Sequence, residues 1–484
     1  MSRSAAPLVL AFDIGTSSLR TALFNTRGEP LEGSAAQAAY PLRYTADGGA
    51  VLAPAVLRRA ALGCLQRTLA SRGSGGKRGA ILGVGTSCFW HSLLGVDGRN
   101  RPLTPIYTWA DSRCGPDADL LRRELPERAV HARTGCMLRA SFWPAKLRWL
   151  RRVDFSLFAR VSRWMSPGEW ICREFAGEAV CGFSMASGTG LLDVRAATWD
   201  EAMLEACGVR SGSMNPLGEA AAKPGFPAGV PWFPAIGDGA AGNLGSGAVR
   251  PGIAAINSGT SAALRVMKSR GIPQAPFGLF CYRVDGRRYL VGGAVSNAGN
   301  LRAWCVRELR LDERKLEAEM ARRPAPLHGL TILPFWTAER APTWDETRRG
   351  GILGLSQNTT ALDILQAAGE ASFYRIARIA EMVLEMEKRP PRFIVSGGVE
   401  RSPSSLQRLA NILGRRVFTT GNQEASLRGA AVYALERLGF DVPTPPLSRA
   451  ISPQPKLVRL YREARHRQLA FEAVPLAQGP PQSG

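Results

Sequence analysis

The sequence predicts an α/β protein, with α+β as the alternative, whose two halves are built alike and face one cleft. One observation is an apolar run at residues 8–14, typical of a buried strand, with a second strand at 19–25 after a short turn. Another is the return of this order, strand then Gly-Thr-Ser then strand, at residues 253–267. A third is the helical spacing at residues 54–70, which is followed by a strand-like segment at 80–86.

The C-terminal part of the chain carries two further helix signals. Residues 423–438 have helical spacing and stop before Gly439, a residue suited to a helix C-cap. Pro-rich segments flank a basic helix at residues 455–474, and the last residues, 479–484, are predicted to be disordered. These signals predict an N-terminal domain at 1–245, a C-terminal domain at 246–445 and a tail at 446–484.

The composition argues against several classes of protein. The net charge is +22, but the basic residues are spread along the chain without a basic run between aromatics, so we do not expect a nucleic-acid partner. No segment approaches the roughly 20 apolar residues of a membrane span. Nine scattered cysteines without a C-x-x-C pair indicate reduced, mostly buried thiols and a cytoplasmic protein.

The turn after the first strand is a candidate phosphate-binding loop. Gly15 permits a tight backbone, so that neighbouring amides and hydroxyls converge on phosphate oxygens, and Asp13 can hold Mg²⁺ through water. The candidate phosphate ligands are Thr16, Ser17, Ser18 and Arg20. An ordinary hairpin turn is the alternative, and the lysine of a Walker A loop is missing.

A second turn of the same kind strengthens the interpretation. Gly259 and Thr260 lie in it, and a nucleotide bound between two halves needs one such turn from each. A strand at 393–396 then ends in Gly397 and Gly398, where a flat base could lie against bare backbone, although a plain strand-to-helix turn fits as well.

Phosphoryl transfer also needs a carboxylate that orients and deprotonates the acceptor hydroxyl. Asp238, in a Gly-Asp-Gly turn shortly before the second phosphate-type turn, is the candidate, with a purely structural turn as the alternative. An aromatic and polar cluster fits a carbohydrate acceptor, since rings pack over Trp and hydroxyls bridge to Asp and Arg. Its members are Trp90, His91, Trp109, Asp111 and Arg113.

With these segments in order, the chain resembles the FGGY carbohydrate kinases of the actin-like, sugar kinase and Hsp70 ATPase superfamily. The matching blocks include FDIGTSSLRTALFN, TSCFWHSLLGVDGRNRPLTPIYTWADSR, NSGTSAALRV, VSGGVERSPSSLQRLANILGRRV and EASLRGAAVYALERLG. The resemblance implies two ribonuclease-H-like domains that close over a cleft, with ATP held mainly by the second and the acceptor mainly by the first. It also implies a small carbohydrate partner and leaves a homodimer open.

The resemblance assigns roles to individual positions. Asp13 matches the metal-associated aspartate, and Asp238 matches the catalytic base. The positions that match nucleotide contacts are Thr16, Ser17, Arg20, Gly259, Thr260, Gly398 and Ser402. The positions that match acceptor contacts are His91, Trp109, Asp111 and Arg113.

The acceptor itself is the least specified part of the prediction. The blocks WHSLLGVD and TWADSR are most similar to the bacterial gluconokinase branch, which implies phosphorylation of D-gluconate to 6-phosphogluconate with Arg113 as a partner for the anion. A xylulokinase-like or other ketose or polyol kinase is the alternative within the family. A non-catalytic sugar-sensing regulator on the same fold is the alternative from another class.

Overall fold

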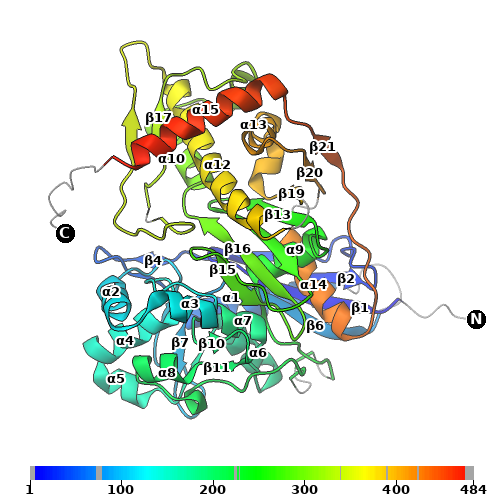
Figure 1. The fold of residues 1–484 in the computed structure, drawn as a ribbon. Coiled ribbons are helices and arrows are strands. Elements are labelled where there is room, and N and C mark those ends of the chain that lie inside the picture. Colours follow the sequence, from blue (N-terminus) through cyan, green and yellow to red (C-terminus); the bar gives the residue numbers. More distant parts are fainter. Residues whose placement is uncertain are drawn as a thin grey trace, which may run out of the picture.

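The computed structural model describes residues 6–71, 79–222, 226–227, 229–337, 339–387, 391–421 and 424–474. Within this part, the chain forms two lobes, and each is built around one large β-sheet with helices packed against it (Figure 1). This arrangement confirms the predicted α/β class. Among the helices of the described residues, none is long and apolar enough to cross a membrane.

The first sheet has five strands in the order β12-β6-β1-β2-β3. Its central strand β1 is antiparallel to β2 and parallel to β6, and β6 is parallel to β12. Every residue of β1 is buried, which explains the uninterrupted apolar run in the sequence. The strands span β1 (Leu8–Ile14), β2 (Ser18–Asn25), β3 (Ala36–Ala39), β6 (Ile81–Cys88) and β12 (Ile236–Gly237).

The second sheet repeats this topology and adds a strand at each edge. Its order is β15-β16-β14-β13-β19-β20-β21, where β13 is antiparallel to β14 and parallel to β19. The two halves are therefore built alike, as predicted. The strands span β13 (Ile253–Ser258), β14 (Ala262–Lys268), β15 (Phe280–Arg283), β16 (Tyr289–Val295), β19 (Arg392–Ser396), β20 (Val417–Thr419) and β21 (Arg449–Ile451).

A large insertion follows β6 in the first lobe and contains most of the residues that the sequence predicts for the acceptor site. Together with α1 (Pro54–Ala70), which packs on β2 and β3, its helices are α2 (Gly115–Glu124), α3 (Glu127–Thr134), α4 (Trp143–Val153), α5 (Phe155–Arg160), α6 (Pro167–Ala176), α7 (Phe183–Ser187) and α8 (Glu201–Cys207). The short strands of this lobe are β4 (Arg43–Tyr44), β5 (Ala50–Leu52), β7 (Leu94–Val96), β8 (Ile106–Tyr107), β9 (Arg163–Met165), β10 (Leu192–Asp193) and β11 (Thr198–Trp199).

The second lobe is covered by helices that include the basic C-terminal one. They are α10 (Gly299–Glu308), α11 (Leu316–Ala321), α12 (Ala361–Glu385), α13 (Pro403–Leu413) and α15 (Pro455–Glu472), with the hairpin β17 (Thr331–Leu333) and β18 (Gly351–Leu353). The predicted tail helix is confirmed as α15, which packs against α12, α13 and β17 and buries Tyr461 (Figure 1). The expected disorder at 479–484 lies outside the described residues.

Two helices join the lobes. The expected Gly-Asp-Gly turn is wrong, because Asp238 is the first residue of helix α9 (Asp238–Ser246), which packs along α14 (Ala425–Arg437). The glycines of this segment are needed for close approach: a Cβ on Gly245 would lie 1.8 Å from the carbonyl oxygen of Ala425. Although α14 comes late in the sequence, it lies against β1 and β6 of the first sheet (orange in Figure 1).

Candidate active site

The carboxyl ends of three neighbouring parallel strands bring two aspartates to one edge of the first sheet. Asp13 is near the end of β1, and its register partner on β6 is Ser87. The hydroxyl of Ser87 donates a hydrogen bond of 2.8 Å to Oδ1 of Asp13. Asp238 directly follows β12, which pairs with β6 at Ser87. Ligands of open α/β sheets bind at such strand ends, so this edge is the candidate catalytic centre.

The two carboxyl groups have perturbed acidities. Burial raises the pKa of Asp13 to about 6; the hydrogen bond from Ser87 opposes this shift and the negative charge of Asp238 adds to it. Burial also raises the pKa of Asp238, and the positive charge of Arg265 opposes the rise. Two carboxyl groups with raised pKa values at one strand edge form a site that favours a cation or a proton.

The residues present fit a magnesium ion that arrives with a nucleotide. Among the described residues, no three His, Cys, Asp or Glu side chains gather into a metal cage. Mg²⁺ needs no such cage, because it is commonly held by one or two carboxylates together with substrate phosphates and water. Asp13 supplies such a carboxylate, and phosphates and water would complete the donor set.

The first phosphate-type turn is a tight hairpin. The amide of Gly15 donates to the carbonyl of Ser18 at 2.9 Å, which leaves Ser17 exposed at the tip. The hydroxyl of Thr16 accepts a hydrogen bond of 3.1 Å from Nε1 of Trp109, so one predicted phosphate ligand and one predicted acceptor residue touch.

Arg20 lies beyond this tip, on β2. Its guanidinium forms an ion pair of 2.9 Å with Glu424 and lies 3.9 Å from Asp13. Glu424, which precedes α14, was missed by the sequence reasoning. Arg20 therefore stands between a carboxylate of the first sheet and one from the end of the chain.

The second turn and the glycine pair lie side by side because β13 and β19 are adjacent parallel strands. Gly397 has φ +94°, and a Cβ there would lie 2.7 Å from the carbonyl oxygen of Ser258. The carbonyls of Gly259 and Thr260 accept hydrogen bonds of 3.0 Å from the first amides of α10. Gly398 begins the next turn of the chain, directly beside this loop.

Ser402, which is predicted to contact the nucleotide, has a structural role in the fold. Its hydroxyl caps the N-terminus of α13 by accepting from the amide of Ser405 at 3.3 Å. It also donates a hydrogen bond of 2.6 Å to Glu317.

Trp90 and His91, two of the residues predicted for the acceptor site, lie close to the backbone around Asp238 and Gly188. The indole of Trp90 is 5% exposed, donates to the carbonyl of Ser184 at 2.8 Å and packs beneath the backbone of Gly237 and Gly239 on either side of Asp238. His91 has φ +66° and its Nδ1 lies 2.6 Å from the carbonyl oxygen of Gly188. Burial lowers the pKa of His91 to about 3, so its imidazole is neutral and can hydrogen-bond a hydroxyl group.

Asp111 and Arg113, which were predicted to bind the acceptor, bind each other in the structure. Nε and Nη2 of Arg113 donate to the two oxygens of Asp111 at 3.0 and 2.6 Å, and the guanidinium stacks on Trp149 at 4.6 Å from the ring centroid. Asp111 is 2% exposed and also accepts from the amide of Ala50 at 3.1 Å. This pair braces the loop that carries Trp109.

The sequence reasoning missed two arginines of the second lobe. Arg265 on β14 reaches the backbone beside Asp238, since a Cβ on Gly239 would lie 2.6 Å from its Nε. Arg340 stacks on Trp109 with its Cζ 5.0 Å from the ring centroid. A charged residue inside the apolar strand at 262–268 was a usable signal, because a buried strand rarely accepts an arginine without a purpose.

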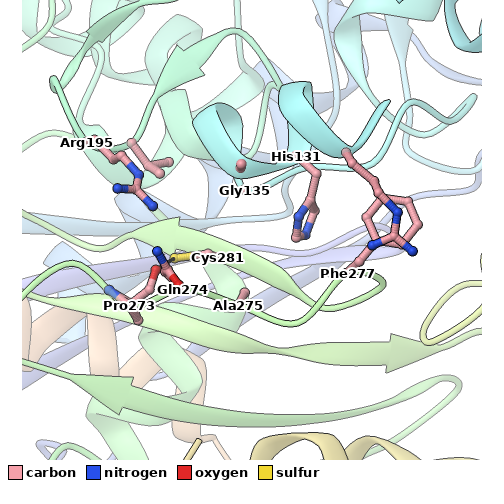
Figure 2. Close-up of a pocket in the computed structure, with 11 residues that line it drawn as sticks. His131, Gly135, Arg195, Pro273, Gln274, Ala275, Phe277 and Cys281 are labelled. Carbon is pink, nitrogen blue, oxygen red and sulfur yellow. Dashed lines mark hydrogen bonds between the residues drawn. The ribbon is translucent and has the colours of Figure 1, made fainter. Parts of the chain in front are cut away.

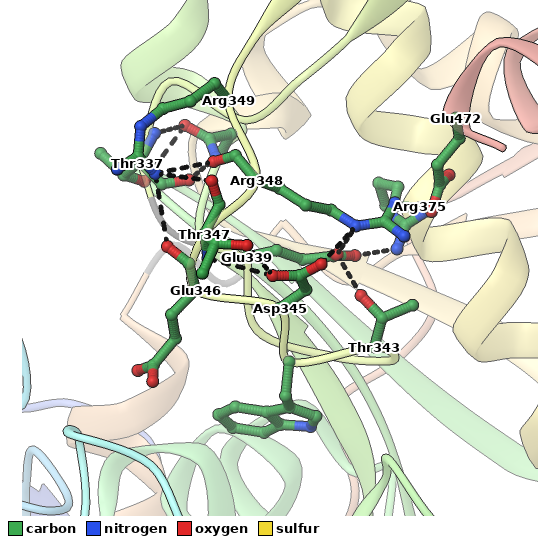
Figure 3. A network of polar contacts seen from close by, with 12 residues as sticks. Thr337, Glu339, Thr343, Asp345, Glu346, Thr347, Arg348, Arg349, Arg375 and Glu472 are labelled. Atoms are coloured by element: carbon green, nitrogen blue, oxygen red, sulfur yellow. Dashed lines mark hydrogen bonds and ion pairs between the residues drawn. The ribbon is translucent and has the colours of Figure 1, made fainter. Parts of the chain in front are cut away.

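The loop that carries Arg340 is fixed by a buried ion network (Figure 3). Arg375 of α12 pairs with Glu339 and, at 2.7 Å, with Glu472 of α15. Arg348 pairs with Glu472 as well and lies 3.2 Å from Asp345. The C-terminal helix is thereby tied to the loop beside the acceptor side.

A separate pocket of about 290 Å³ lies between α3 and the segment before β15 (Figure 2). Cys281 lines this pocket, whereas the next residue, Tyr282, packs on Trp90 and His91 with ring centroids 4.9 and 5.9 Å apart. Successive strand residues point to opposite faces, so the pocket lies behind the acceptor cluster. Its other labelled walls include Arg195 and Phe277.

The nine cysteines are all free and buried, as predicted.

Two sugar kinases are similar to this chain over most of its length. A gluconokinase of Bacillus subtilis (strain 168) is 27% identical over 456 residues, which cover 89% of this chain and 88% of the relative. A xylulose kinase of Escherichia coli (strain K12) is 26% identical over 445 residues, 88% of this chain and 89% of the relative.

Solved structures share the fold. The gluconate kinase from Lactobacillus acidophilus superposes with a TM-score of 0.88 at 23% identity and covers 97% of this chain and 98% of its own. The models of the FGGY family of carbohydrate kinases match in chain order, the N-terminal domain at residues 8–245 and the C-terminal domain at residues 254–436. With both domains matched over most of its length, this chain belongs to the FGGY family of carbohydrate kinases.

Proposed function

We propose that this carbohydrate kinase transfers the γ-phosphoryl group of ATP to D-gluconate and yields 6-phosphogluconate. The observation that carries the proposal is the position of Asp238, a carboxylate of raised pKa that directly follows β12 and is close enough for electrostatic interaction with both Asp13 and Arg265. A carboxylate of raised pKa is a stronger base at neutral pH and suits proton transfer from a hydroxyl.

The chain's own residues divide the reaction between the lobes. Asp238 takes the proton of the acceptor hydroxyl as that oxygen attacks the γ-phosphorus, and the phosphoryl group leaves ADP. Mg²⁺ held through water by Asp13 would neutralise charge on the nucleotide phosphates, while Asp238 stays free to act as the base. The amides and hydroxyls of the two turns bind the phosphate oxygens; these residues are Thr16, Ser17, Ser18, Gly259 and Thr260.

The nucleotide base has a place beside the second turn. Gly397 and Gly398 expose bare backbone next to Ser258, so a flat ring can approach without meeting a side chain. Arg20 supplies a positive charge near Asp13. On the acceptor side, Trp109 connects Thr16 to Arg340, and the neutral imidazole of His91 suits a sugar hydroxyl.

A ketose or polyol acceptor is the second candidate, since the xylulose kinase relative is about as similar as the gluconokinase one. A non-catalytic sugar sensor is disfavoured because Asp13 and Asp238 are both in place. The homodimer and the cytoplasmic location stay predictions, as do the domain boundaries near residues 245 and 445.

A coupled ADP-release assay with ATP and Mg²⁺ tests the proposal against gluconate, xylulose, ribulose and glycerol. Gluconate is expected to give the highest kcat/KM. Asp238→Asn is expected to lower kcat by about 10²- to 10⁴-fold while ATP still binds. Asp441→Asn, at an exposed position, is the matched control. Full activity of Asp238→Asn would overturn the base assignment, and stimulation by a neutral ketose alone would replace gluconate.

A further inference from the structure

We infer that Arg265 and Arg340 form an anion subsite that holds the carboxylate of the acceptor, so that they, and not Arg113, select a sugar acid over a neutral sugar. The inference rests on the proposed function, because it concerns the acceptor side of the same site. It assigns substrate selection to two residues of the second lobe.

Arg265 is a buried cation whose hydrogen-bonding capacity is not fully used. It extends from β14 to the backbone beside Asp238, and its Nε is buried without a hydrogen-bond acceptor. A buried N–H group without a partner costs free energy, and native proteins retain few of them. Among the ion pairs of the described residues, none involves the Arg265 guanidinium, although the charge of Asp238 acts on it.

Arg340 also has a guanidinium group held in place without an anionic partner among its hydrogen-bond acceptors. Its Nε donates to the hydroxyl of Ser296 and its Nη2 to the carbonyl of Val295, both at 3.2 Å, while the planar group stacks on Trp109. These contacts fix the orientation of the guanidinium but are to neutral groups. Burial, and next the charge of Arg265, lower the pKa of Arg340 to about 10, as expected for two desolvated cations that repel each other.

The surroundings of His91 add a third cation, Lys146, to the two arginines. After burial, the charges of Lys146, Arg340 and Arg265 all lower the pKa of this histidine. Lys146 is itself buried and donates to the carbonyls of Ala140 and Ser141. Asp238 is the carboxylate whose charge acts on both arginines, so a neutral sugar would leave them with one negative charge between them. The carboxylate of a sugar acid would add a second and accept charge-assisted hydrogen bonds.

Arg113, the partner that the sequence suggested for an anion, is already committed. Two of its nitrogens bind Asp111 and its face lies on Trp149, so its charge is neutralised where it stands. A second anion could also meet Arg265 and Arg340, namely the phosphoryl group in transfer. The carboxylate and the phosphoryl group share the same chemistry of recognition, and the experiment below separates them.

The test compares the binding of D-gluconate with that of D-glucitol, which carries a hydroxymethyl group in place of the carboxylate. Titration calorimetry is done on the full chain with Mg²⁺ and a non-hydrolysable ATP analogue. We expect the wild type to bind gluconate at least about 10-fold more tightly than glucitol. Arg340→Met and Arg265→Met are each expected to weaken gluconate binding by about 10- to 100-fold and to leave glucitol binding within about 3-fold.

Two further variants keep the result interpretable. Arg340→Lys retains the charge and is expected to restore part of the preference for gluconate, which a loss of fold would not allow. Arg459→Met removes an exposed arginine of α15 that pairs with Glu463 at 3.2 Å, and it is expected to bind gluconate as the wild type does. Affinity for the ATP analogue is measured for each variant in the same titrations.

Three outcomes would overturn the inference. The wild type could bind gluconate and glucitol equally, or the methionine variants could lose affinity for both ligands equally. A loss of affinity for the ATP analogue alone would assign the arginines to the phosphoryl group. Failure of the proposed function looks different. A wild type that binds gluconate with the expected selectivity and releases no ADP would refute phosphorylation of gluconate and retain the anion subsite.

Discussion

Replacement of Asp13 by asparagine is expected to stabilise the nucleotide-free protein at neutral pH while it removes activity. Asp13 has a folded-state pKa of about 6, compared with an ordinary value of 3.8, because its carboxyl group is buried on β1. The folded state therefore holds a proton that the unfolded state releases. Stability from this group is fully present below pH 3.8 and is lost as the pH rises through 6.

The magnitude follows from the shift. Ionisation of Asp13 costs the folded state about 3 kcal/mol at pH 7.5 and about 1 kcal/mol at pH 4.5. An asparagine side chain at this position cannot ionise and retains the shape of the aspartate. The variant Asp13→Asn should accordingly exceed the wild type in free energy of unfolding by up to about 3 kcal/mol at pH 7.5, with the advantage falling by about 2 kcal/mol at pH 4.5.

Urea unfolding of the nucleotide-free protein, followed by tryptophan fluorescence at the two pH values, measures this difference. Asp441→Asn, at an exposed position outside the site, serves as the control and should shift little at either pH. The reasoning is refuted if Asp13→Asn and the wild type differ by the same amount at pH 4.5 and pH 7.5, or if the variant is the less stable protein at pH 7.5.

Three further substitutions test other parts of the structure. Gly397→Ala should lower the free energy of unfolding by about 1–3 kcal/mol and weaken ATP binding, because φ is +94° and a Cβ would clash with the backbone of Ser258. Its control, Gly329→Ala, is also at positive φ but in open space, and it should leave ATP binding unchanged. Gly429→Ala would place a Cβ 1.8 Å from the carbonyl oxygen of Ala241 and should lower the melting temperature, because it forces α9 and α14 apart. Its control, Gly369→Ala on α12, should stabilise the folded protein by about 1 kcal/mol, and thermal unfolding measures both effects. Arg375→Met should lower the free energy of unfolding in urea by about 3 kcal/mol, because Glu339 and Glu472 lose a buried partner. Its control, Arg378→Met at an exposed neighbouring position, should change that free energy by less than about 0.5 kcal/mol. Equal effects of a variant and its control would contradict the reasoning in each case.

Much of the fold was predictable because the residues of the central strands show their burial directly in the local sequence. The strands at 8–14 and 253–258 are largely buried on both faces, so an uninterrupted apolar run marks them. The turns that follow need glycine and small polar residues, which makes the repeat visible. The helix at 423–438 was predicted within two residues of α14 at its start, and Gly439, with φ +88°, follows its end.

The parts that were missed depend on distant partners. Gly-Asp-Gly at 237–239 looked like a turn because glycine disfavours helices, but these residues begin α9, whose contact with α14 overrides that preference. Arg113 looked free because nothing in the spacing shows that Asp111 folds back onto it. Arg265 and Arg340 come from different strands and loops, so that only the folded chain places them beside Asp238 and Trp109.

The position of α14 also bears on how the protein is made. Val9, Ala11 and Phe24 of the first sheet pack against Leu427 and Leu435 of α14, which the ribosome adds more than 400 residues later. The N-terminal half therefore emerges with one apolar face uncovered and stays incomplete until nearly the whole chain has been synthesised. A fragment that stops at residue 245 would carry the same exposed face, so its solubility would depend on adding α14 back as a separate peptide.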